Sequence, residues 1–199
     1  MLTSAPNLLT LSRVLLIPVL VALFFIEGDL ARYLACACFT LAATTDYVDG
    51  HLARRWQQQS PFGRWLDPVA DKLLVASAIL MLVGYDRAPL LPCLIILLRE
   101  ITVSGLREYL AELSVGLPVS RLAKWKTAVQ MVALGFLLVG DAGPTTLPVL
   151  EIGWWGLWIA AMLTLVTGYD YLRAGLHHMM EENQRATAPA ARVDGAERA

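Results

Sequence analysis

The sequence has few cysteines and few charged residues, and each shortage excludes a class of protein. Its three cysteines all lie inside apolar stretches, and an odd number in that setting argues against a disulfide framework. Charged residues make up 17% of the 199 residues and hydrophobic residues 57%, with a mean hydropathy of +0.56. This balance is unusual for a soluble domain and typical of a helical membrane protein. The net charge of −1 carries little information about partners, and we expect no nucleic-acid partner.

Six apolar stretches predict an all-α integral membrane protein with six transmembrane helices. A hydrocarbon layer about 30 Å thick takes roughly 20 helical residues. The fifth stretch is the weakest, because Lys124 and Lys126 stand at its start. The stretches are Leu8–Ile26, Ala31–Val48, Trp65–Gly84, Leu90–Leu110, Thr127–Val139 with its flanks, and Val149–Leu172.

The two ends of the chain carry different signals. Residues 27–29 (EGD) follow the first apolar run without a small-residue cleavage site, so we do not expect a signal peptide. Pro6 and Asn7 precede that run and predict a short N-terminal interfacial helix. Residues 181–199 are polar and alanine-rich without an apolar face, which predicts a disordered cytoplasmic tail after a membrane domain of residues 1–180.

The basic residues predict the orientation. Loops near residues 27–32, 84–89 and 140–147 would share one side of the membrane, and they hold only Arg32 and Arg87 of the 16 lysines and arginines. Because basic residues collect on the cytoplasmic side, both termini are predicted to be cytoplasmic.

Four aspartates lie close together between the second and third apolar stretches. An ionised side chain at membrane depth costs several kcal/mol unless it is paired, hydrated or bound to a cation. Four charges of one sign also repel one another and raise one another's pKa. A solvated cytoplasmic loop is an alternative for residues 54–59, but not for the aspartates, whose spacing is helical. They are Asp46, Asp49, Asp67 and Asp71.

The spacing predicts one acidic face on each of two helices. In the first helix, Asp49, Gly50 and Arg54 follow Asp46 by three, four and eight residues. In the second, residues 63, 67 and 71 (Gly, Asp, Asp) repeat the interval of four. Helices joined by a short loop are antiparallel neighbours, so all four carboxylates can face one another at the cytoplasmic end.

The start of the second of these helices carries two prolines with different meanings. Ser60 and Pro61 are a suitable N-cap and first helical residue. Pro68 removes one backbone donor inside the helix, and whether it kinks the helix stays open at this stage.

Facing carboxylates need a cation. Oxygen ligands without histidine or cysteine suit Mg²⁺, Mn²⁺ or Ca²⁺ rather than structural zinc. Four aspartates exceed what one Mg²⁺ usually takes from protein, so we expect two ions. A pair of divalent cations is typical of phosphoryl-type transfer, where it neutralises a pyrophosphate and orients attack. Gly50 and Gly63 leave space where a ligand would approach.

The full pattern, D-x2-D-G-x2-A-R-x8-G-x3-D-x3-D, resembles the signature of the CDP-alcohol phosphatidyltransferase family without a departure. It fixes eight positions over 26 residues, which makes it specific. The resemblance implies a six-helix membrane enzyme, usually a homodimer, that replaces the CMP of a CDP-linked lipid with an alcohol at a dimetal site. Its cofactors would be two divalent cations, Mg²⁺ or Mn²⁺.

The resemblance also implies residue roles. Asp46, Asp49 and Asp67 would bind metal, and Asp71 would contribute to the metal site and act as the general base that deprotonates the alcohol. The CDP-lipid would be bound by Gly50, Ala53, Arg54 and Gly63. The chemistry of Arg54 agrees, because a guanidinium offers a bidentate fork to a pyrophosphate.

Further stretches resemble the branch of the family whose acceptor is sn-glycerol 3-phosphate and whose donor is CDP-diacylglycerol. With the aspartate region they extend the resemblance to about Leu138. They are PNLLTLSRVLLIP, DPVADKLLVA, LLREITVSGLREYLAEL and RLAKWKTAVQMVAL. A cardiolipin synthase or a phosphatidylinositol-phosphate synthase of the same fold is the alternative within the family.

Basic residues inside the apolar stretches suit a phosphate-bearing acceptor. Arg99 and Arg107 lie in the fourth stretch, where an unpaired cation is expensive. Arg107 either belongs to a structural ion-pair network with Glu100 or Glu108, or helps to hold the acceptor phosphate.

The remaining candidates for the acceptor site are Lys124 and Lys126, which could equally anchor the chain to anionic membrane lipids. A divalent-cation transporter is the alternative from another class. Transport predicts acidic residues spread across the membrane depth, whereas here they gather at one end.

Overall fold

The computed structural model describes residues 5–56, 61–112 and 121–187. Every regular element in these ranges is helical, which confirms the predicted all-α class for the described part of the chain. Only the backbone is described for residues 5–9, 46–56, 61–62, 64–65, 112, 121, 174 and 177–187.

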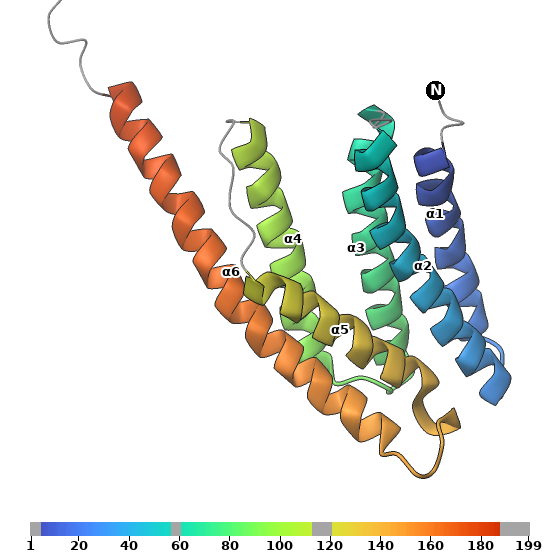
Figure 1. Ribbon diagram of the computed structural model, residues 1–199. Coiled ribbons are helices and arrows are strands. Elements are labelled where there is room, and N and C mark those ends of the chain that lie inside the picture. Colours follow the sequence, from blue (N-terminus) through green and yellow to red (C-terminus); the bar gives the residue numbers. More distant parts are fainter. Residues whose placement is uncertain (1–4, 57–60, 113–120, 188–199) are drawn as a thin grey trace, which may run out of the picture.

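Successive helices run in alternating directions through the molecule, so that the α2–α3 junction lies at the same end as the start of α1 and the end of α6 (Figure 1). The other end holds the connections between α1 and α2, α3 and α4, and α5 and α6. The elements are α1 (Ala5–Leu23), α2 (Asp29–Trp56), α3 (Pro61–Gly84), α4 (Leu90–Glu112), α5 (Arg121–Val139), the 3₁₀ turn η1 (Gly140–Ala142) and α6 (Val149–Thr187).

Two predicted boundaries at the chain ends are wrong. The predicted interfacial helix is not a separate element, because α1 is continuous from Ala5. Pro6 falls in the first turn of α1, where its missing N–H leaves no helical bond unmade. At the other end α6 reaches Thr187 and includes residues 181–187, which the sequence assigned to the tail. These residues (EENQRAT) include several good helix formers, which can extend a helix without an apolar face.

Pro68 does not interrupt α3, which is one helix from Pro61 to Gly84. Pro68 is exposed, and its carbonyl accepts a hydrogen bond of 3.0 Å from Lys72 Nζ. The predicted start of this helix at Pro61 is confirmed.

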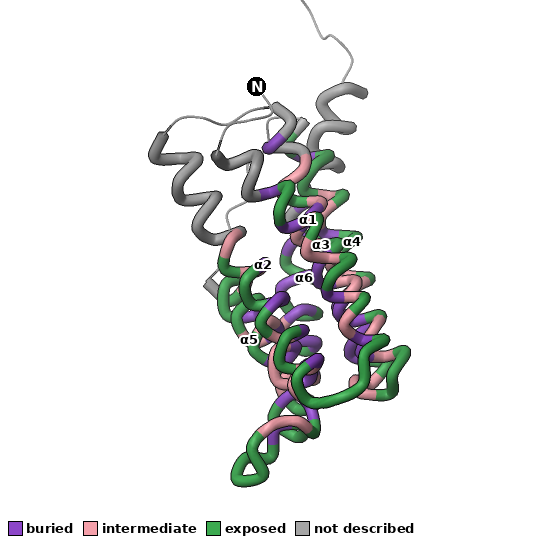
Figure 2. Tube along the Cα trace, turned by 90° about the vertical axis from the view of Figure 1, so that its right-hand side faces the viewer, coloured by how far each residue is buried: buried purple, intermediate pink, exposed green. Residues whose placement is uncertain are grey.

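The outer surface of the helices is unusually apolar. Buried positions recur along the helices on the faces that pack together (Figure 2), and large apolar side chains are nevertheless exposed on all six helices. Leu30 is 73% exposed and Leu15 is 63% exposed. A soluble monomer rarely shows so much exposed apolar surface, whereas lipid-facing helices do.

Two helical segments within the described residues are long and apolar enough to cross a membrane: Leu122–Ala142 and Val149–Arg173. A shorter apolar helix spans Thr10–Leu23. α4 has 23 residues and is therefore about 35 Å long, and α2 and α3 are longer still. These three helices carry charged residues, which lower their apolar content. Six spans stay a prediction.

The end opposite the aspartates is closed by polar contacts. Arg32 Nη1 lies 3.2 Å from Asp141 Oδ2, and the Tyr33 hydroxyl donates to the Ala142 carbonyl at 2.6 Å. The C-terminus of α3 is capped by bonds from the N–H groups of residues 86 and 87 to the carbonyls of residues 83 and 82. Asp86 has a φ of +55° there, a left-handed conformation that favours glycine.

Candidate active site

The two aspartates of α3 are placed by helical spacing and by a contact with α1. Asp67 and Asp71 are four residues apart, so their side chains point from the same face, and both are half-buried. The Thr10 hydroxyl of α1 donates a hydrogen bond of 2.5 Å to Asp67 Oδ1. Thr10 is only 1% exposed, so this bond fixes one carboxylate oxygen in a dry environment.

The predicted residues of α2 lie on the helix that meets α3 at the same end (Figure 1). The side chains of Asp46, Asp49, Ala53 and Arg54 lie outside the described residues, and so does any detail at Gly50. Their roles therefore stay a prediction. Gly63 lies in the first turn of α3 and is buried.

The chemistry of the described donors fits a hard cation. Asp67 and Asp71 offer carboxylate oxygens, and no histidine or cysteine is among the described residues that line the two pockets at Asp71. Among the side chains that the structure describes, no group of three histidines, cysteines, aspartates or glutamates is close enough to hold a metal ion. A complete ligand set would therefore need Asp46 and Asp49 from α2.

A pocket of about 780 Å³ joins Asp71 to the basic residues of α4 and α5. All four residues proposed from the sequence for the acceptor phosphate line it together: Arg99, Arg107, Lys124 and Lys126. The fold therefore brings these four residues, which are distant from Asp71 in sequence, to the same cavity as its carboxylate. We call this cavity the basic pocket.

Two of these four cations already have anionic partners, and a fifth cation, Lys72, also lines the basic pocket. Lys126 is buried, and its Nζ donates to Glu100 Oε1. Arg99 Nη1 lies 3.4 Å from the same oxygen, while Arg99 Nη2 donates to Thr167 Oγ1 at 3.1 Å. The Arg99 guanidinium also lies 5.7 Å from the centre of the Tyr171 ring. Glu100 thus neutralises part of the charge on one wall.

Of the two interpretations of Arg107, the ion pair with Glu100 or Glu108 is not formed among the described residues. Glu100 is seven residues before Arg107, about 10 Å along the helix axis, and it pairs with Arg99 and Lys126 instead. Within the described part of the chain, Arg107 and Lys124 form no ion pair, and both are exposed to the basic pocket. These two cations can reach a ligand without giving up a partner.

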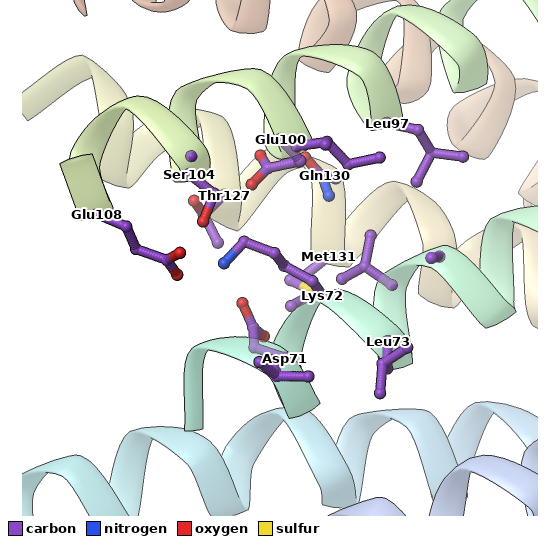
Figure 3. Close-up of a pocket in the computed structure, with 15 residues that line it drawn as sticks. Asp71, Lys72, Leu73, Leu97, Glu100, Ser104, Glu108, Thr127, Gln130 and Met131 are labelled. Atoms are coloured by element: carbon purple, nitrogen blue, oxygen red, sulfur yellow. The ribbon is translucent and has the colours of Figure 1, made fainter. Parts of the chain in front are cut away.

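A second pocket, of about 450 Å³, lies between α3, α4 and α5 (Figure 3). Most of its walls are apolar, with Leu97 and Met131 among them. It shares one stretch of wall with the basic pocket, so the two cavities adjoin. The shared residues are Asp71, Lys72, Glu100, Ser104 and Thr127. We call this cavity the apolar pocket.

Sequence reasoning missed Thr10, Arg13 and Gln130. Thr10 and Arg13 are buried one helical turn apart on α1, although both belong to a stretch that was noted for its resemblance. Gln130 is buried on α5 in another such stretch. The sequence did offer one signal for these residues. A polar side chain inside an apolar helix costs free energy at membrane depth and therefore marks a candidate for binding or structural contacts.

Helices with apolar outer faces, two aspartates on one face of α3 and a basic pocket beside Asp71 define a helical protein whose pocket can hold an anion next to an apolar surface. The chain belongs to the CDP-alcohol phosphatidyltransferase family, whose model matches residues 3–166. Members of this family generally use divalent cations.

Curated relatives carry a more specific name. A protein of Rickettsia typhi is 48% identical over 85% of this chain and 95% of its own length. One of Pseudomonas fluorescens is 44% identical over 90% and 94%, and one of Cereibacter sphaeroides is 38% identical over 90% and 98%. All three are named CDP-diacylglycerol–glycerol-3-phosphate 3-phosphatidyltransferase.

Proposed function

We propose that the chain transfers the phosphatidyl group of CDP-diacylglycerol to sn-glycerol 3-phosphate, giving phosphatidylglycerophosphate and CMP. The observation that carries this proposal is the basic pocket, which joins Asp71 to Arg107 and Lys124, two cations that form no ion pair with any described residue. A small acceptor with a phosphate at one end and a hydroxyl at the other fits that arrangement. The names of the relatives support the same donor and acceptor.

The proposed reaction is a single exchange at phosphorus. The primary hydroxyl of the acceptor gives its proton to Asp71 while its oxygen attacks the phosphorus that carries diacylglycerol. A new P–O bond forms, the P–O bond to CMP breaks, and CMP leaves with the electron pair. Arg54 would bind the pyrophosphate of the donor, with Gly50, Ala53 and Gly63 leaving room for the nucleotide.

Two divalent cations, Mg²⁺ or Mn²⁺, when bound, would neutralise the pyrophosphate and orient the attack. We assign their ligands to Asp46, Asp49, Asp67 and Asp71. The Thr10 hydroxyl would hold Asp67 in position, because it binds one oxygen, Oδ1, and leaves Oδ2 for a metal ion. The oxygen-only donor set of the described residues supports this choice of metal.

The four basic residues would have two different roles: two would contact the acceptor phosphate, and two would shape the pocket. Arg107 and Lys124 would contact the acceptor phosphate directly, since neither has an anionic partner among the described residues. Arg99 and Lys126 would shape the pocket through Glu100, which neutralises part of their charge. Lys126 would reach the phosphate only by leaving Glu100.

We further propose a bacterial cytoplasmic membrane location, with both termini and the active site cytoplasmic. Among the lysines and arginines of the described residues, only Arg32, in the first turn of α2, and Arg87, in the connection between α3 and α4, lie near the end opposite the aspartates, which supports this orientation. The exposed apolar faces of the helices would contact membrane lipids, and one such face would pair two copies in a homodimer. The membrane domain would comprise residues 1–180, and the last turns of α6, to Thr187, would extend beyond it.

The alternatives differ in the acceptor. A cardiolipin synthase would use phosphatidylglycerol and a phosphatidylinositol-phosphate synthase would use inositol phosphate, with the same donor. The names of the relatives favour glycerol 3-phosphate over both. A divalent-cation transporter would leave the basic pocket without a purpose.

To test this proposal, purified protein is incubated with CDP-diacylglycerol, Mg²⁺ and one acceptor at a time, and the release of CMP is measured. We expect glycerol 3-phosphate to support turnover well above the other acceptors, and Asp71→Asn to abolish it. Faster CMP release with phosphatidylglycerol would identify the protein as a cardiolipin synthase. Faster release with inositol phosphate would identify it as a phosphatidylinositol-phosphate synthase. No release with any acceptor would refute the proposed function.

A further inference from the structure

A third cavity lies at the end of the molecule opposite Asp71. It has a volume of about 250 Å³ and is formed where the connection between α1 and α2 meets the connection between α3 and α4 (Figure 1). Arg32 and Arg87, the two cations that the described residues place near this end, both line it, and so does Glu27. We call this cavity the distal pocket. Both cations therefore converge on one cavity that the proposed reaction does not use.

Arg87 has no anionic partner among the described residues. Its guanidinium lies 5.5 Å from the centre of the Phe24 ring and 5.7 Å from that of the Tyr85 ring. The side chain is half-buried, and its nitrogens donate no hydrogen bond to any described residue. Burial lowers the pKa of Arg87, the like charge of Arg32 lowers it further, and Asp141 acts in the opposite direction. The two rings thus hold the cation in place and leave its N–H groups available to a ligand.

Arg32 is only partly neutralised. Its Nη1 atom lies 3.2 Å from Asp141 Oδ2, but that side chain is 71% exposed, so the attraction is weakened by water. Two guanidiniums on one cavity with a single exposed ion pair favour an anionic ligand. Because a guanidinium presents a planar fork of donors that matches phosphate oxygens, a phosphate is the group that these two arginines are suited to bind.

Two further features distinguish a lipid headgroup from free phosphate. Glu27 is exposed beside the arginines and forms no ion pair with any described residue, so its carboxylate is available to a cation and repels a bare anion. The chain beside the pocket is apolar and open: Phe25 is 72% exposed, Ile26 59% and Leu30 73%. Acyl chains can cover such a surface. A ligand with a phosphate, a neighbouring positive group and acyl chains complements all of these features.

We propose that the distal pocket binds the headgroup of a zwitterionic phospholipid, with its phosphate on Arg32 and Arg87 and its ammonium group on Glu27. This site is independent of the proposed function, because it lies at the other end of the helices from Asp71. An anionic phospholipid supplies the phosphate without the ammonium group, and inorganic phosphate supplies neither an ammonium group nor acyl chains. Both are therefore expected to bind more weakly.

The test measures binding to the purified full chain in detergent by native mass spectrometry. Short-chain phosphatidylethanolamine, short-chain phosphatidylglycerol and inorganic phosphate are added separately. We expect phosphatidylethanolamine to bind about two- to fivefold more tightly than phosphatidylglycerol, as one exposed charge pair allows, and inorganic phosphate to bind more weakly than either lipid. Arg87→Gln should weaken the binding of both lipids by about tenfold. Arg173→Gln removes an equal charge from an exposed position on α6, remote from the pocket, and should change neither.

Glu27→Gln separates the two lipids. It should remove the preference for phosphatidylethanolamine, because the amide no longer attracts the ammonium group or repels an anion. Asp86→Asn is the matched control, since Asp86 is an exposed carboxylate in the connection between α3 and α4 but does not line the distal pocket. It should keep the preference.

Binding is expressed per folded protein in each preparation, so a reduced yield of a variant does not affect the comparison. Arg87→Lys keeps the charge without the fork and serves if Arg87→Gln cannot be purified; it should also weaken both lipids. Equal binding of the two lipids, tighter binding of phosphatidylglycerol or inorganic phosphate, or lipid binding that is unchanged in the Arg87 variants would overturn the inference. So would a preference that survives Glu27→Gln.

Discussion

Replacing Thr10 with valine tests whether α1 holds the metal-binding carboxylate of α3 in place. Valine has nearly the shape of threonine, and position 10 is only 1% exposed, so the substitution removes the hydroxyl without opening a cavity. The bond that is lost joins Thr10 Oγ1 to Asp67 Oδ1 at 2.5 Å. A hydrogen bond to a charged group contributes about 1.5–3 kcal/mol, equivalent to roughly a ten- to hundredfold change in an equilibrium constant.

We therefore expect Thr10→Val to raise the Mg²⁺ concentration needed for half-maximal CMP release by about ten- to a hundredfold. At saturating Mg²⁺ the rate should largely recover, because Asp67 itself is intact. Thr10→Ser keeps the hydroxyl and should behave like the unaltered protein. The measurement is a Mg²⁺ titration of CMP release for the three proteins, with thermal unfolding as a check on folding. An unchanged Mg²⁺ midpoint in Thr10→Val would show that Asp67 does not depend on α1, or does not bind the metal.

Four other substitutions test separate parts of the site and of the fold. Asp71→Asn should lower kcat by about 10²–10⁴-fold while CDP-diacylglycerol still binds, as measured by inhibitor or equilibrium binding; more than half the normal rate would exclude Asp71 as the base. Arg107→Ala and Lys124→Ala should each raise the KM for glycerol 3-phosphate by about ten- to a hundredfold and leave the KM for CDP-diacylglycerol nearly constant, whereas a parallel rise of both would indicate a structural role. Asp86→Gly should stabilise the protein by about 0.5–1 kcal/mol in thermal unfolding, because glycine accepts the φ of +55° without strain, and a lower melting temperature would contradict this account of the cap.

Patterns within one helix could be predicted from the sequence. The start of α4 at Leu90 and of α6 at Val149 agree with the predicted stretches, because a loop with charged or turn-forming residues precedes each apolar run. The interval of four between Asp67 and Asp71 likewise needed only the geometry of a helix. The predicted end of the last helix was wrong, because a polar helical segment without a packing face shows no hydrophobic periodicity in the sequence.

Contacts between helices could not be predicted in the same way. Thr10 and Asp67 are 57 residues apart, and Glu100 and Lys126 are 26 apart, so each pairing depends on how two helices are rotated and tilted against each other. Sequence spacing suggested Glu100 or Glu108 as a partner of Arg107. In the structure Glu100 instead pairs with Lys126, a cation on the neighbouring helix α5. The burial of Gln130 could not be predicted for the same reason, because it depends on how α5 packs against the neighbouring helices.

The most direct test of the central claim follows labelled sn-glycerol 3-phosphate into lipid. Purified protein is incubated with CDP-diacylglycerol, the labelled acceptor and Mg²⁺, and the label in the organic phase is compared with the CMP released. We predict one labelled phosphatidylglycerophosphate per CMP, with both products lost after exhaustive chelation and restored by Mg²⁺ or Mn²⁺. Release of CMP without labelled lipid, or full turnover after chelation, would contradict the account.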